Sequence, residues 1–120
     1  MNSKKPTGIN RIIRACFYSF EGLKAAFSHE AAFRQEICLV AVFGPLGFFM
    51  GRTATERALL ILPLFAVLIT ELLNSAIEAV VDRTGKQIHP LSKRAKDMGS
   101  AAVFISLVMT CVIWAVVLFA

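Results

Sequence analysis

The sequence predicts an all-α membrane protein with one N-terminal surface helix followed by three transmembrane helices. The 120 residues are 57% hydrophobic, whereas soluble domains average about 45–50% apolar residues. A soluble core of this size cannot bury so much apolar surface. The formal net charge is nevertheless +5, because 13 Lys and Arg residues outnumber 8 Asp and Glu residues. This composition excludes a disordered tail, a disulfide-rich secreted module and a typical nucleic-acid binder, and it favours a single domain over residues 1–120.

Residues 8–28 form the predicted surface helix. Their apolar residues recur at helical spacing and fill one stripe, namely Ile9, Ile12, Ile13, Cys16, Phe17, Phe20, Leu23 and Phe27. Arg11, Arg14, Tyr18 and Glu21 occupy the opposite side. This pattern favours an amphipathic helix that lies on the membrane with its basic residues toward the lipid headgroups. The alternative is an amphipathic helix packed against protein.

The three predicted transmembrane segments are residues 31–51, 57–81 and 98–120. The last contains no charged residue and is long enough to cross a bilayer core of about 30 Å. The second is uncharged from Ala58 to Thr70, and Pro63 predicts a bend in it. The first is apolar only from Ile37 to Gly51. Pro45 and the nearby glycines predict that its outer end is irregular.

Basic residues decide the predicted orientation. Residues 1–36 hold Lys4, Lys5, Arg11, Arg14, Lys24 and Arg34, and residues 82–97 hold Arg83, Lys86, Lys93, Arg94 and Lys96. The short loop between the first two spans holds only Arg52 and Arg57. The positive-inside rule therefore places the N-terminus and the second loop in the cytoplasm and the C-terminus outside.

A polar stripe runs along the end of the second span. Glu71, Asn74, Glu78 and Asp82 are spaced by 3, 4 and 4 residues, so they share one face of a helix. The stripe extends over about 16 Å. An ionised carboxylate at the bilayer centre costs roughly 2.5–3.5 kcal/mol, so two glutamates on one face indicate a functional site. The alternative is a polar contact between helices, which Asn74 alone would supply.

Further charged residues are expected at the same depth in the membrane as the polar stripe. Glu30 precedes the first span, and Lys96 and Asp97 open the third. A carboxylate pair such as Glu30 and Glu78 suits Mg²⁺, and Lys96 offers a positive charge to a phosphate. Glu71, the deepest carboxylate, suits a general base acting on a lipid hydroxyl. Together these residues indicate phosphoryl transfer at a membrane surface, although the P-loop and protein-kinase motifs are absent from the sequence.

The stripe also predicts assembly. Three helices of one subunit are not expected to enclose a polar pocket, so the stripe would face lipid unless another subunit covered it. We therefore expect a homo-oligomer. Small residues that permit close helix contacts lie at Ser75, Ala76, Ala79, Ser100, Ala101 and Ala102.

Three segments carry a family resemblance: Glu30–Glu36 (EAAFRQE), Glu71–Arg83 (ELLNSAIEAVVDR) and Arg94–Ala102 (RAKDMGSAA). With these segments, the chain resembles the prokaryotic diacylglycerol kinases, which are integral-membrane lipid kinases, over nearly its whole length. The resemblance implies a homotrimeric helical bundle in the bacterial inner membrane, with active sites shared between protomers on the cytoplasmic side. It also implies that ATP and Mg²⁺ are used to phosphorylate diacylglycerol to phosphatidic acid.

The resemblance assigns roles to individual residues. It implies that Glu71 is the catalytic base and that Glu30 and Glu78 bind the metal. Lipid contacts are implied for Glu71, Ser100, Arg34 and Gln35. The stripe residues Asn74 and Asp82 are expected to support the site. ATP contacts are implied for Arg11, Tyr18, Glu30, Glu78, Gln87, His89, Lys96 and Asp97.

The sequence departs from the family pattern at two positions near the expected nucleotide. Gln87 stands where an acidic residue is expected, and Lys93 replaces a small residue. Three other functions remain open from the residues alone. They are phosphorylation of undecaprenol on the same scaffold, ion- or proton-coupled transport through intramembrane carboxylates, and a non-enzymatic scaffold.

Overall fold

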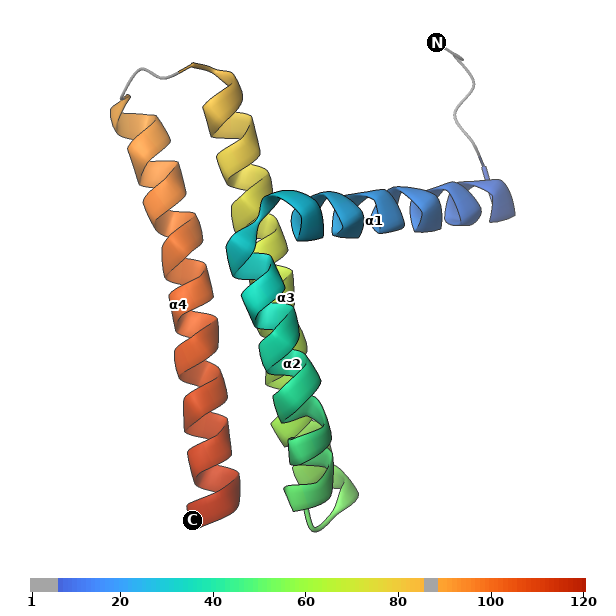
Figure 1. Cartoon of the computed structure of the whole chain (residues 1–120), viewed down its shortest axis with the longest axis vertical. Helices are drawn as coiled ribbons and strands as arrows, with labels where there is room; N and C mark the ends of the chain where they lie inside the picture. Colours follow the sequence, from blue (N-terminus) through green and yellow to red (C-terminus); the bar gives the residue numbers. More distant parts are fainter. Residues whose placement is uncertain (1–6, 86–88) are drawn as a thin grey trace.

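The computed structural model describes residues 7–85 and 89–120, and within these ranges all regular secondary structure is helical. Its four helices are α1 (Ile9–His29), α2 (Ala31–Met50), α3 (Ala54–Arg83) and α4 (Pro90–Phe119). Helices α2, α3 and α4 run alongside one another, and α1 projects sideways from them (Figure 1). The last three helices are long and apolar enough to cross a membrane. The predicted all-α fold with three spans is confirmed, while the exact membrane boundaries stay a prediction.

The corner between α1 and α2 is held by a side chain of α2. Glu30 adopts an extended backbone between the two helices. The Arg34 guanidinium donates to the carbonyl oxygens of Phe27 at 2.7 Å and Ser28 at 3.3 Å. These are carbonyls at the end of α1, where helices leave acceptors unpaired. The apolar stripe of α1 remains exposed in the single chain. Whether that stripe rests on a membrane surface stays a prediction.

Helix α2 differs from its prediction at the outer end. It continues as a regular helix through Pro45 to Met50, so the expected irregularity is wrong. Helix α3 likewise continues through Pro63. Membrane helices tolerate proline because neighbouring helices and hydroxyl side chains satisfy the freed backbone groups. The carbonyl that Pro63 leaves without its helical donor is that of Leu59, four residues earlier. Thr110 of α4 separately donates to the carbonyl oxygen of Pro63 itself at 3.5 Å.

A tight turn joins α2 to α3. Thr53 caps α3 by accepting from the Glu56 amide at 3.1 Å, and the Glu56 carboxylate accepts from the Arg52 amide at 2.7 Å. This reciprocal arrangement resembles a capping box. Arg57 closes the turn by donating to the Gly51 carbonyl oxygen at 3.2 Å. The turn therefore returns the chain antiparallel to α2 with few residues.

A polar seam joins α3 to α4 along most of their length. It consists of four antiparallel contacts: Asn74 with Gly99, Thr70 with Ser106, Pro63 with Thr110 and Leu60 with Trp114. The Thr70 and Ser106 hydroxyls lie 3.1 Å apart, and the Trp114 indole donates to the Leu60 carbonyl oxygen at 3.0 Å. Polar contacts of this kind hold membrane helices together where apolar packing has no advantage over lipid. The seam therefore sets the register of α3 against α4.

Trp114→Phe is expected to lower the free energy of unfolding by about 0.6 kcal/mol and at most about 1.7 kcal/mol, the range for interhelical hydrogen bonds in membranes. The change removes the indole donor to Leu60 and keeps an aromatic ring beside Phe43. Unfolding is followed by circular dichroism in mixed detergent micelles. Tryptophan fluorescence is unsuitable, because Trp114 is the single tryptophan and the variant lacks it. The matched control is Phe104→Leu, which alters an exposed ring on the same helix. Equal stabilities of the two variants would contradict the prediction.

Candidate active site

The stripe on α3 changes from buried to exposed along the helix. Glu71 is 5% exposed and Asn74 8% exposed, Glu78 is half-buried and Asp82 is exposed. The expectation that these side chains face lipid unless a second subunit covers them is wrong for Glu71 and Asn74. Packing against α2 and α4 buries both within one chain, so burial of the stripe is not by itself evidence for an oligomer.

Three further carboxylates lie within electrostatic range of Glu71. Glu30, at the start of α2, and Glu78 both lie within electrostatic range of Glu71. Glu36 of α2 does so as well. Like charges held this close in an apolar environment are costly, and such arrangements are typical of functional sites. The structure therefore brings together the predicted base and the two predicted metal ligands.

Glu36 is the member that sequence reasoning missed. It is 8% exposed, and its Oε2 atom has no hydrogen-bond partner among the described residues. It also borders an apolar cavity of about 270 Å³ between α2, α3 and α4. The available signal was a carboxylate inside the first predicted span, because charged residues within membrane helices are rare and usually functional. Glu36 also ends the resemblance segment Glu30–Glu36, but no role was implied for it.

Asn74 supports Glu78 from one turn earlier on α3. Its Nδ2 atom donates to Glu78 Oε1 at 3.3 Å. On its other side Asn74 packs against Gly99 of α4, so closely that a Cβ added there would overlap its Oδ1 atom. The close approach of the two helices therefore determines where the Asn74 amide lies and, through it, the Glu78 carboxylate.

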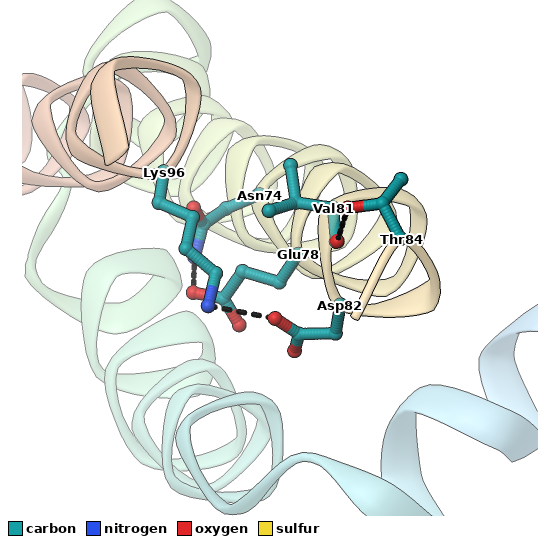
Figure 2. Close-up of polar contacts among 6 residues, drawn as sticks. All are labelled: Asn74, Glu78, Val81, Asp82, Thr84 and Lys96. Carbon is teal, nitrogen blue, oxygen red and sulfur yellow. Dashed lines mark hydrogen bonds and ion pairs between the residues drawn. The ribbon is translucent and has the colours of Figure 1, made fainter. Parts of the chain in front are cut away.

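Lys96 reaches from α4 across to α3. Its Nζ atom forms an ion pair with Asp82 Oδ1 at 2.7 Å (Figure 2), whereas Glu78 acts on it only through its charge. A second pair joins Lys93 to Asp97 at 2.6 Å within α4. Lys93, one of the two departures from the family pattern, thus neutralises a residue with an implied nucleotide contact.

The other predicted residues that the structure describes form no side-chain hydrogen bond or ion pair with this group. His89 caps α4, its Nδ1 atom accepting from the Leu91 amide at 3.1 Å. Arg34 is engaged with the end of α1. The hydrogen bonds and ion pairs of residues 7–85 and 89–120 do not link α1 to the stripe, and Gln87 lies outside the described residues. Exposed side chains are found at Arg11, Tyr18, Gln35 and Ser100.

The donor set suits a hard divalent cation that shares its coordination with phosphate. Residues 7–85 and 89–120 contain no group of three or more His, Cys, Asp or Glu side chains that could hold a metal unaided. Mg²⁺ usually takes one or two protein carboxylates and completes its shell with water and substrate phosphates. Glu30 and Glu78, both partly accessible, match that requirement.

Comparison with known proteins gives consistent matches. The family model described as "Prokaryotic diacylglycerol kinase" matches residues 17–118. The chain is 49% identical to the diacylglycerol kinase of Haemophilus influenzae over 96% of its own length and 98% of that protein. It is 52% identical to the Pseudomonas aeruginosa diacylglycerol kinase, with 96% and 94% covered. For the Escherichia coli K12 diacylglycerol kinase the identity is 50%, with 93% and 92% covered.

Proposed function

The chain belongs to the prokaryotic diacylglycerol kinase family, and we propose that it transfers the γ-phosphoryl group of ATP to the hydroxyl of diacylglycerol with Glu71 as the general base. One observation carries the proposal beyond the family. The buried Glu71 carboxylate lies at the inner end of a stripe that leads to the half-buried Glu78 and the exposed Asp82. This graded stripe joins an apolar region suited to a lipid with a polar region suited to a nucleotide.

Glu71 acts on the lipid hydroxyl. A carboxylate with 5% exposure is shielded from water, so its lone pairs are available to the substrate hydroxyl that enters from the lipid side. Glu71 takes the hydroxyl proton as the oxygen attacks the γ-phosphorus, and ADP leaves. Because phosphoryl transfer needs little covalent chemistry from the protein, positioning and electrostatics supply most of the acceleration.

Glu30 and Glu78 hold Mg²⁺ and thereby bind ATP. When bound, Mg²⁺ neutralises phosphate oxygens and orients the γ-phosphoryl group. Lys96 supplies a further positive charge to the phosphates. Asp97, His89, Arg11 and Tyr18, together with Gln87, are proposed to contact the nucleotide. Ser100, Arg34 and Gln35 are proposed to contact the lipid.

Assembly and location complete the proposal. We place the site on the cytoplasmic side of the bacterial inner membrane and assign the chain to a homotrimer whose protomers share active sites. Basic residues at the end of α3, at the start of α4 and along α1 support this orientation. The exposed Arg11 and Tyr18 on α1 are distant in sequence from the stripe, and a neighbouring protomer would bring equivalent groups to it.

The direct test supplies purified protein with labelled ATP and one lipid at a time in mixed micelles. Label incorporated into diacylglycerol, and not into undecaprenol, is the expected result. Preferential labelling of undecaprenol would assign the chain to the alternative acceptor. ATP hydrolysis that does not depend on either lipid would contradict the proposed kinase reaction.

Glu78→Ala is expected to raise the Mg²⁺ concentration needed for half-maximal activity by about tenfold or more. Loss of one of two carboxylates removes half of the protein's contribution to a site that Mg²⁺ fills with few protein ligands. Initial rates measured against free Mg²⁺ at fixed ATP report the change. Glu21→Ala, which removes an exposed carboxylate from α1, is the control. An unchanged metal requirement in Glu78→Ala would refute the ligand role.

A further inference from the structure

We propose that Asp82 is a positioning residue that holds the Lys96 ammonium away from Glu78, so that the Glu78 carboxylate stays available to a divalent cation. The inference rests on the proposed function, in which Glu78 binds the metal and Lys96 binds phosphate. It concerns a residue to which that function assigns no contact with substrate, metal or nucleotide.

The ion pair between Asp82 and Lys96 connects two helices at the end of the stripe. Lys96 Nζ lies 2.7 Å from Asp82 Oδ1. The other ion pair of residues 7–85 and 89–120, between Lys93 and Asp97, stays within one helix. Asp82 therefore fixes where an α4 lysine ends relative to the α3 carboxylates.

The Lys96 ammonium has two carboxylates within reach. Glu78 precedes Asp82 by one helical turn on the same face of α3, and its charge also acts on Lys96. The hydrogen bond, however, goes to Asp82 (Figure 2). Glu78 instead accepts from the neutral amide of Asn74 at 3.3 Å. Asn74 thus holds the Glu78 carboxylate in place, while Asp82 pairs with the ammonium that could otherwise pair with Glu78.

Removal of the Asp82 charge leaves the Lys96 ammonium without its partner. Lysine is a point charge on a flexible four-carbon stem, so Lys96 is expected to move to the remaining carboxylate, Glu78. An ammonium paired with a metal ligand competes directly with a divalent cation for that ligand. The metal site would then be weakened although both of its carboxylates are intact.

A double-mutant cycle tests the mechanism by binding instead of turnover. The probe is the Mn²⁺ complex of the non-hydrolysable ATP analogue AMP-PCP, and its dissociation constant is measured by electron paramagnetic resonance on detergent-solubilised protein. Asp82→Asn is expected to weaken binding at least fivefold. In the Lys96→Gln background the same change is expected to alter binding less than twofold, because the competing ammonium is gone. Asp82→Glu, which keeps the negative charge, is expected to bind the probe nearly as tightly as the unmodified protein.

The controls separate charge from position. Glu21→Gln removes the same charge from the exposed face of α1 and is expected to bind the probe within twofold of the unmodified protein. A fivefold effect of Asp82→Asn that persists in the Lys96→Gln background would show that Asp82 acts through its own charge and would overturn the inference. Unchanged binding in Asp82→Asn would also overturn it. Failure of the unmodified protein to bind the probe would instead contradict the proposed metal and nucleotide site itself.

Discussion

Glu71→Gln is expected to reduce kcat by about 10²- to 10⁴-fold, the contribution usual for a general base, while nucleotide binding and assembly are retained. Glutamine has nearly the same shape as glutamate, so the packing around this 5% exposed side chain is preserved. Its amide cannot accept the proton of the lipid hydroxyl. The loss therefore falls on the chemical step, and KM for ATP is expected to change little.

The measurement combines lipid-dependent phosphorylation rates with binding of the Mn²⁺–AMP-PCP complex. Glu56→Gln is the matched control, because Glu56 lies in the turn between α2 and α3 and glutamine also serves in a capping box. This control is expected to retain activity within twofold. If Glu71→Gln turned over at a rate near that of the unmodified protein, the assignment of Glu71 as base would be wrong.

Gly99→Ala is expected to destabilise the protein by about 1–3 kcal/mol, as overpacking of a tight contact does, and to reduce activity together with stability. An added Cβ would overlap Asn74 Oδ1 and would lie 3.4 Å from Asn74 Cγ. Either α3 and α4 separate or the Asn74 amide turns away from Glu78. The gain in helix propensity from glycine to alanine, at most about 1 kcal/mol, is smaller than the expected strain.

Gly44→Ala provides the comparison for this variant. Gly44 also lies within a membrane helix, but a Cβ at this position would have no neighbour within 4 Å. Its substitution is expected to leave stability unchanged or slightly raised. Thermal unfolding followed by circular dichroism, with phosphorylation rates on the same samples, distinguishes the two positions. Equal behaviour of Gly99→Ala and Gly44→Ala would show that the α3–α4 contact does not require glycine.

Much of the architecture was predictable because it depends on local composition. Long uncharged segments identified the three apolar helices, and the spacing of Glu71, Asn74, Glu78 and Asp82 placed them on one face of α3. The continuous helix through Pro45 was not predictable in this way. Proline weakens a helix locally, but the surrounding packing decides whether the helix is interrupted.

The candidate site was predicted in part. Glu71, Glu78 and Glu30 were identified from charge in apolar surroundings and from the family resemblance, and the structure places Glu30 and Glu78 within electrostatic range of Glu71. Glu36 was missed, because its burial depends on helices distant in sequence. Gln87, which lies outside the described residues, stays a prediction, as do the individual roles of the other site residues.

Periodicity and charge in the sequence were sufficient to define the helices, the polar face of α3 and the basic segments that predict orientation, because each of these is a property of neighbouring residues. Packing between distant segments decided the rest. Thr70 meets Ser106 across 36 residues of chain, Gly99 brings α4 against Asn74, and Lys96 is paired with Asp82. Glu71 is buried within a single chain, whereas the pattern of α3 alone suggested a face open to lipid. A pattern defines a face, but only the three-dimensional arrangement determines which helix covers it.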